Sequence, residues 1–160
     1  MKRDSENQQI YFYIRGHVRD SFKTNRLKNF VKLLKLNFPN IKFILQTWKN
    51  NECKNNESWK NINENNIITS KSVIDNYFKD KNLTEQCLLI DEKSIELIGS
   101  SDGTVGGGPC PKKGLKNMWY GIYKGLENLN TDHFNDVIVI SRFDYFDIVQ
   151  SAGIGEMQII

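Results

Sequence analysis

The chain has 160 residues, of which 39% are hydrophobic and 26% are charged, and its formal net charge is +3. This length suffices for one hydrophobic core and is short for two, so we predict a single domain over residues 1–160. No apolar run reaches the roughly 18 residues of a membrane helix, and the modest, dispersed charge disfavours a dedicated nucleic-acid binder.

The cysteines and the amino-terminal segment indicate a reducing compartment. Cys53, Cys87 and Cys110 lie far apart and form no C-x-x-C pair. This spacing argues against a disulfide framework and against a zinc site. The first residues, MKRDSENQQ, lack the apolar segment of a signal peptide. We therefore expect reduced thiols and a cytoplasmic location.

The first predicted elements are a strand, a helix and a second strand. Gln9–Ile14 is rich in aromatic and β-branched residues, which predicts a strand. Apolar residues then recur at helical spacing from Leu27 to Phe38, and Pro39 ends that helix. Ile41–Leu45 predicts the second strand. Such a β-α-β unit favours parallel strands joined by a right-handed crossover.

A polar stretch between Lys49 and Glu64 separates these elements from the next ones. Ser72 is the predicted N-cap of a short helix, and Cys87–Ile90 predicts a third strand. Glu96–Ile98 is a candidate for one more short strand. The glycine-rich segment 99–111 predicts a long loop, and it contains neither the P-loop pattern nor the dinucleotide-binding glycine pattern.

The strongest helical pattern runs from Leu115 to Leu129, where apolar residues form a sustained stripe. Gly121 and Gly125 lie one turn apart within it. Each glycine costs about 1 kcal/mol relative to alanine in a helix interior. We expect close packing against a strand to offset that cost; a ligand contact is the alternative.

The most informative stretch is Val137–Ile140, four consecutive β-branched residues followed by Arg142 and Asp144. It predicts a strand that is buried on both faces of an α/β sheet. Alternation along a strand places Arg142 and Asp144 on one face and Phe143 on the other. Ligands of open α/β sheets bind outside the carboxyl ends of the strands, so this pair suits a phosphate held with a divalent metal. The alternative is an ion pair that ends a strand.

Two further basic clusters flank predicted elements. Arg15, His17 and Arg19 follow the first strand, where they line a ligand site or form a solvated surface. Lys112 and Lys113 precede the long helix, where an anion can settle.

An ordered series of segments resembles a family of glycosyltransferase-like proteins found in surface-polysaccharide gene clusters and in some large DNA viruses. The segments are YIRGHVRDSF, ILQTWK, ESWKNI, LIGSSDG, KGLKNMWYGIYKGLE and VIVISRFDYFDI. The resemblance implies the nucleotide-binding half of a GT-A glycosyltransferase, a Rossmann-like, mostly parallel α/β sheet with helices on both faces. It also implies a nucleotide sugar and a glycan or other hydroxyl acceptor as partners, in the host cytoplasm if the protein is viral.

The resemblance implies roles for individual residues. The segment Arg142-Phe143-Asp144 takes the place of the family's D-x-D motif, Gly16 and its neighbours correspond to the first strand-end loop, and Thr47 with Trp48 corresponds to the second. By residue type alone, Trp48 and Trp119 are instead expected in the core. With the basic clusters, the predicted donor-binding set is Arg15, Gly16, His17, Arg19, Thr47, Trp48, Lys112 and Arg142.

The resemblance assigns catalysis and metal binding to acidic residues. Asp144, with Asp147, would hold Mg²⁺ or Mn²⁺ on the donor diphosphate, and Asp102 and Asp147 are the candidate general bases. Because Arg142 replaces the first acid of the motif, donor phosphates and water would complete the metal shell.

Two alternatives to a complete glycosyltransferase follow from the sequence. The chain stops at Ile160, which predicts an incomplete acceptor portion, and a binding module that needs a partner subunit or a second copy is the first alternative. An RNA-binding domain, based on mild basicity and scattered aromatic residues, is the second.

Overall fold

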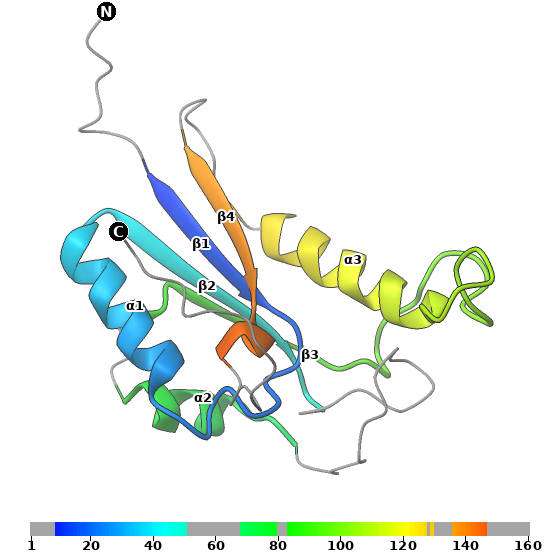
Figure 1. Cartoon of the computed structure of the whole chain (residues 1–160), viewed down its shortest axis with the longest axis horizontal. Coiled ribbons are helices and arrows are strands. Elements are labelled where there is room, and N and C mark those ends of the chain that lie inside the picture. Colours follow the sequence, from blue (N-terminus) through cyan, green and yellow to red (C-terminus); the bar gives the residue numbers. More distant parts are fainter. Residues whose placement is uncertain (1–8, 51–67, 80–82, 128, 130–135, 147–160) are drawn as a thin grey trace, which may run out of the picture.

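The computed structural model in Figure 1 describes residues 9–50, 68–79, 83–127, 129 and 136–146. Strands and helices alternate along the chain. In order they are β1 (Ile10–Arg15), α1 (Arg26–Asn37), β2 (Ile41–Trp48), α2 (Lys71–Phe78), β3 (Gln86–Ile90), α3 (Lys112–Glu127), β4 (Val137–Arg142) and the 3₁₀ helix η4 (Phe143–Phe146).

The strands form one parallel sheet in the order β3-β2-β1-β4. The chain moves from β1 outward to β3 and then returns to the other side of β1. Because parallel crossovers are right-handed, this reversal places the later helix on the opposite face from the earlier ones. Accordingly α1 and α2 cover one face and α3 covers the other (Figure 1). The predicted Rossmann-like α/β fold with helices on both faces is confirmed.

Side-chain alternation along β1 and β2 divides the core between these two faces. Ile14 and Phe43 face α1 and α2, where they pack with Leu27 and Ile74. Tyr13 faces α3 and is 1% exposed, and its hydroxyl donates to the Gly121 carbonyl oxygen at 2.5 Å. Both faces of the central strands are therefore buried, in keeping with the run of apolar residues from Phe43 to Leu45 in β2.

Local signals place the helix ends. Ser70, rather than the predicted Ser72, is the N-cap of α2, since its hydroxyl oxygen accepts a hydrogen bond from the Val73 N–H at 3.3 Å. Helix α1 ends before Pro39, and Phe38 donates its N–H to the Leu34 carbonyl oxygen. None of the described helices combines the length and the apolar character needed to cross a membrane.

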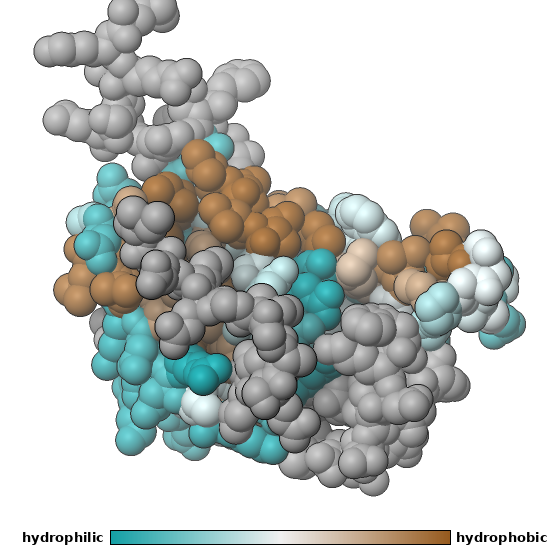
Figure 2. All heavy atoms as spheres, in the orientation of Figure 1, coloured by the Kyte–Doolittle hydropathy of each residue, from teal (hydrophilic) through white to brown (hydrophobic). Residues whose placement is uncertain are grey.

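Two predictions about strands are wrong. Residues 96–98 form no strand, and the β-branched residues of β4 are not buried on both faces: Ile138 is 40% exposed and Ile140 is 45% exposed. The reason is position, because β4 is an edge strand of the described sheet while the helices pack over its centre. Figure 2 shows the resulting hydrophobic band along β4.

Candidate functional site

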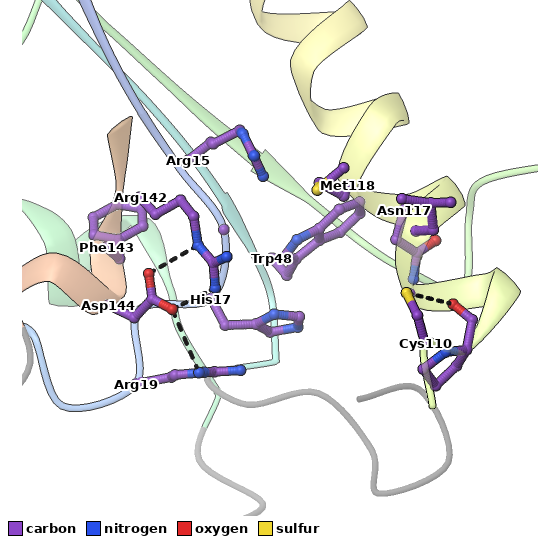
Figure 3. A pocket seen from close by; sticks show the side chains of 14 residues that line it. Arg15, His17, Arg19, Trp48, Cys110, Asn117, Met118, Arg142, Phe143 and Asp144 are labelled. Carbon is purple, nitrogen blue, oxygen red and sulfur yellow. Dashed lines mark hydrogen bonds and ion pairs between the residues drawn. The ribbon is translucent and has the colours of Figure 1, made fainter. Parts of the chain in front are cut away.

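A pocket opens at the carboxyl ends of the parallel strands. Arg15, Trp48 and Arg142, the last residues of β1, β2 and β4, all line it (Figure 3). The pocket lies beside the point where strand order reverses, between β1 and β4. In open α/β sheets this reversal separates the loops on its two sides and creates the usual ligand crevice. The strand order and the pocket therefore indicate the same candidate ligand site.

Arginine side chains dominate the charge of this pocket. Arg15 and Arg142 are partners in the β1–β4 register, so their side chains leave the same face of the sheet side by side. Burial lowers the pKa of Arg15, and the neighbouring charge of Arg142 lowers it further. The Arg15 Nε atom is buried and has no hydrogen-bond partner. The residue as a whole is half-buried, and the charge of Asp144 offsets the lowering of its pKa only in part. A partly desolvated cation beside a like charge favours a bound anion.

Asp144 is the carboxylate among the residues that line the pocket. Its Oδ1 accepts a hydrogen bond from Arg142 Nε at 2.9 Å, its Oδ2 pairs with Arg142 Nη2, and Arg19 Nη1 lies 3.8 Å from Oδ2. Arg142 and Asp144 therefore lie on one face as predicted, and they form the ion pair that was the alternative interpretation, while Phe143 is 1% exposed in the core on the α1 side. Strand alternation is only part of the cause, because the strand ends at Arg142 and Asp144 lies in η4.

The loop after β1 has an uncommon backbone conformation at Gly16 and Arg19. Gly16 has φ 107° and Arg19 has φ 47°, both in the left-handed region. For a residue with a side chain such as Arg19, this conformation is disfavoured and tends to cluster at binding sites. The loop turns sharply after β1 and places Arg19 against Asp144.

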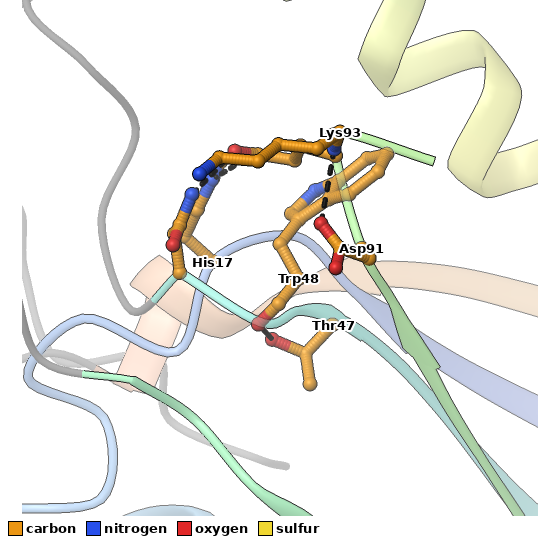
Figure 4. Close-up of polar contacts among 7 residues, drawn as sticks. His17, Thr47, Trp48, Asp91 and Lys93 are labelled. Atoms are coloured by element: carbon orange, nitrogen blue, oxygen red, sulfur yellow. Dashed lines mark hydrogen bonds and ion pairs between the residues drawn. The ribbon is translucent and has the colours of Figure 1, made fainter. Parts of the chain in front are cut away.

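His17 belongs to a hydrogen-bonded chain that the sequence did not reveal. Its Nε2 lies 2.8 Å from Glu92 Oε1, and Asn50 Nδ2 donates to Glu92 Oε2 at 2.9 Å. Burial alone would raise the pKa of Glu92, but the hydrogen bonds from His17 and Asn50 and the His17 charge outweigh it and lower that pKa. An ionised Glu92 only accepts hydrogen bonds, so Nε2 is the protonated nitrogen of His17. Figure 4 shows His17 beside Trp48.

We predict that Glu92→Gln lowers the free energy of unfolding by about 1 kcal/mol at pH 7, because a charge-assisted hydrogen bond is lost. A lowered pKa in the folded state stabilises the protein above the ordinary pKa of 4.5, and this contribution disappears as pH falls through the lowered value. Urea unfolding at several pH values between 7 and 3 should therefore show the two proteins converging in acid. The exposed Glu96→Gln serves as the control. Equal stability of wild type and Glu92→Gln at pH 7 would contradict the assignment.

The pocket wall opposite the arginines is neutral. It consists of Trp48 with residues from the start of α3 and the segment before it, namely Cys110, Pro111, Gly114, Leu115, Asn117 and Met118. Trp48 is 3% exposed, as predicted, so it forms a wall of the pocket rather than a free stacking surface. The same prediction is wrong for Trp119, which is 60% exposed. Figure 3 shows Trp48 between the arginine side and Asn117.

Some predicted site residues lie elsewhere. Thr47 is fully buried and alternates away from Trp48, so it faces the α1 side of the sheet. Lys112 begins α3 but does not line the pocket, and its backbone N–H donates to the Gly103 carbonyl oxygen. Asp102 is exposed on the loop before α3. Asp147 lies outside the described residues. The structure thus gathers Arg15, Gly16, His17, Arg19, Trp48, Arg142 and Asp144 in one pocket.

A second hollow lies between α2 and the start of β3. Its lining includes an ion pair between Lys71 and Asp75 and the thiol of Cys87, whose pKa is raised by burial. It lies at the amino end of β3, away from the strand ends where ligands of such sheets bind. Across the described part of the chain, no group of three or more His, Cys, Asp or Glu residues is placed to hold a metal ion.

Comparison with known protein families, with curated proteins and with solved structures finds no match for this chain.

Proposed function

We propose that the pocket binds the diphosphate of a nucleotide sugar, and that the chain acts as a GT-A-type glycosyltransferase on that donor. One observation carries the proposal. The half-buried Arg15, whose Nε is buried and unpartnered, lies beside the like-charged Arg142 at the strand-order reversal. A diphosphate would supply an acceptor for that Nε and negative charge beyond that of Asp144.

The charges of the pocket favour an anion over a cation. The guanidinium groups of Arg15, Arg19 and Arg142 face the single carboxylate of Asp144. Asp144 already holds Arg142 and Arg19, so in this proposal it orients the groups that contact phosphate. Arginine suits this task because its planar group binds phosphate oxygens in pairs.

The described residues do not fit the divalent metal that the resemblance implies. Mg²⁺ and Mn²⁺ take oxygen ligands, and the pocket offers one carboxylate whose two oxygens are engaged by guanidinium groups. A cation at Asp144 would also face the charge of the neighbouring arginines. In this proposal the guanidinium groups of Arg15, Arg19 and Arg142, rather than a metal ion, neutralise the charge of the diphosphate.

Transfer would break the bond between the anomeric carbon and the diphosphate oxygen and form a bond from that carbon to an acceptor oxygen. Guanidinium groups that already face the diphosphate would stabilise the charge that grows on it. A general base must accept the proton of the acceptor hydroxyl. The imidazole of His17, which Glu92 orients, is a better candidate for this base than the exposed Asp102. Binding without transfer is the second candidate, since Asp144 is the only carboxylate that lines the described pocket.

Calorimetric titration of the chain with UDP, GDP, CDP, ADP and inorganic pyrophosphate tests the proposal. We expect at least one diphosphate to bind, with affinity that falls as salt rises and does not require Mn²⁺. Absence of binding by every one of them at low salt would overturn the proposal. Incubation of the matching nucleotide sugars with simple glycans then separates the two candidates, because release of nucleoside diphosphate supports transfer and binding alone supports the module.

A further inference from the structure

The neutral half of the pocket contains a second unpartnered polar atom. Asn117 is 5% exposed, projects from α3 toward the sheet and lines the pocket, and its Oδ1 has no hydrogen-bond partner. Buried carbonyl oxygens without a partner are rare in folded proteins and call for an explanation. Gly121, one turn further along α3, sits directly against Gln46, so this part of the helix is pressed close to β2.

The two ends of the pocket are therefore chemically different and both incomplete. At one end the unpartnered Nε of Arg15 lacks a hydrogen-bond acceptor, and at the other the unpartnered Oδ1 of Asn117 lacks a hydrogen-bond donor. The side chains of Trp48 and Met118 lie near Asn117 (Figure 3). Small-molecule sites commonly have this composition, with apolar walls and a few polar groups that fix orientation.

We infer that Asn117 reads the nucleobase of the ligand, with its carboxamide hydrogen-bonded to the edge of the base while the arginines hold the phosphates. This inference rests on the proposed function and adds the recognition of the base to it. Every nucleobase carries donors and acceptors side by side on one edge, and a carboxamide matches such a pair. A phosphorylated compound without a base would leave the Asn117 oxygen without a partner, and a buried polar group left unpaired weakens binding.

The first arm of the test uses the wild-type chain. Calorimetry compares inorganic pyrophosphate and ribose 5-phosphate with UDP, GDP, CDP and ADP. We expect at least one nucleoside diphosphate to bind tenfold or more tightly than pyrophosphate. Equal affinity for pyrophosphate and all four nucleotides would overturn the role of Asn117 and leave the proposed function intact. Failure of pyrophosphate and of every nucleotide to bind would overturn both.

The second arm uses Asn117→Leu, which keeps the size of the side chain and removes its polar atoms. We expect the preference for the nucleotide over pyrophosphate to fall at least tenfold, with pyrophosphate affinity within twofold of wild type. We also expect the melting temperature to stay equal or rise, because an unpartnered buried oxygen has been removed. A structural Asn117 would give the opposite pattern, a lower melting temperature with an unchanged preference, and that result would overturn the inference.

Two further variants complete the test, one as a control and one as an independent repeat. Asn37→Leu makes the same exchange at an exposed position at the end of α1 and should change neither affinity. Asn117→Ala removes the amide without adding a branched side chain, so it repeats the test if leucine fits poorly. Retention of the full nucleotide preference in Asn117→Ala would also overturn the inference.

Discussion

Gly125→Ala is expected to lower the free energy of unfolding by about 3 kcal/mol. Helix propensity alone predicts the opposite sign, since alanine is favoured over glycine by about 1 kcal/mol within a helix. In this fold, however, a Cβ atom at position 125 would lie 2.1 Å from Cζ and 2.3 Å from Oη of Tyr13. Tyr13 is 1% exposed and its hydroxyl donates a hydrogen bond to the Gly121 carbonyl oxygen, so the ring has no room to move. Overpacking of this kind costs 1–3 kcal/mol or more, according to the general trend for cores.

Urea unfolding of wild type and Gly125→Ala measures this loss. The clashing atoms all belong to the outer part of the Tyr13 ring, so Tyr13→Leu should relieve the clash. We expect the double variant Tyr13→Leu/Gly125→Ala to be more stable than the sum of the two single changes predicts, by about 1 kcal/mol or more. Strict additivity, or a stabilising Gly125→Ala, would show that α3 does not approach β1 this closely.

Arg15→Met is expected to weaken diphosphate binding at least tenfold while leaving the protein equally stable or slightly more stable. A hydrogen bond to a charged group contributes about 1.5–3 kcal/mol, which corresponds to roughly a tenfold to hundredfold change in affinity. The unliganded protein, in contrast, loses a half-buried cation that has a buried, unpartnered Nε and is repelled by Arg142. Removing such a group relieves up to about 1 kcal/mol of unfavourable free energy.

Calorimetry with pyrophosphate and thermal unfolding without ligand measure the two halves of this prediction. Arg26→Met removes an exposed arginine at the start of α1 and is the matched control for net charge. We expect the control to bind pyrophosphate within twofold of wild type. A loss of stability in Arg15→Met together with unchanged binding would identify Arg15 as a structural residue and remove the main support for the proposed function.

Several features of the unliganded pocket lower the stability of the folded chain. Arg15 is half-buried and Asn117 is buried, each has a buried polar atom without a partner, and Arg19 has a left-handed backbone. Each of these features is unfavourable in the unliganded chain, and a ligand that completes the hydrogen bonds would compensate for it. Stabilising substitutions that abolish binding are the expected signature of such a site.

Short apolar runs and helical periodicity along the chain were sufficient to predict the main elements and their parallel arrangement. The apolar runs of β1, β2 and β3 and the long stripe of α3 are local signals, so each was visible without knowledge of the others. The glycines of α3 were also informative, and the structure confirms that Gly121 and Gly125 pack against strands, where Gln46 and Tyr13 fill the space that a side chain would need.

The site was predictable only where strand ends alone determine it. Arg15, Arg142 and Asp144 stood out because they follow buried-looking strands. Asn117 and Glu92 did not, because an asparagine in a helix and a glutamate in a loop carry no local sign of burial. Their roles depend on α3 crossing above Trp48 and on the chain after β3 passing beside His17.

Sequence by itself thus determined which segments become strands and helices, since hydrophobic periodicity and turn residues act over a few neighbours. Tertiary structure decided the rest: that β4 lies at an edge and exposes its apolar residues, and that two arginines more than a hundred positions apart become adjacent. The physical reason is that burial and charge pairing are set by strand order, which right-handed crossovers and the reversal after β3 impose on the whole chain.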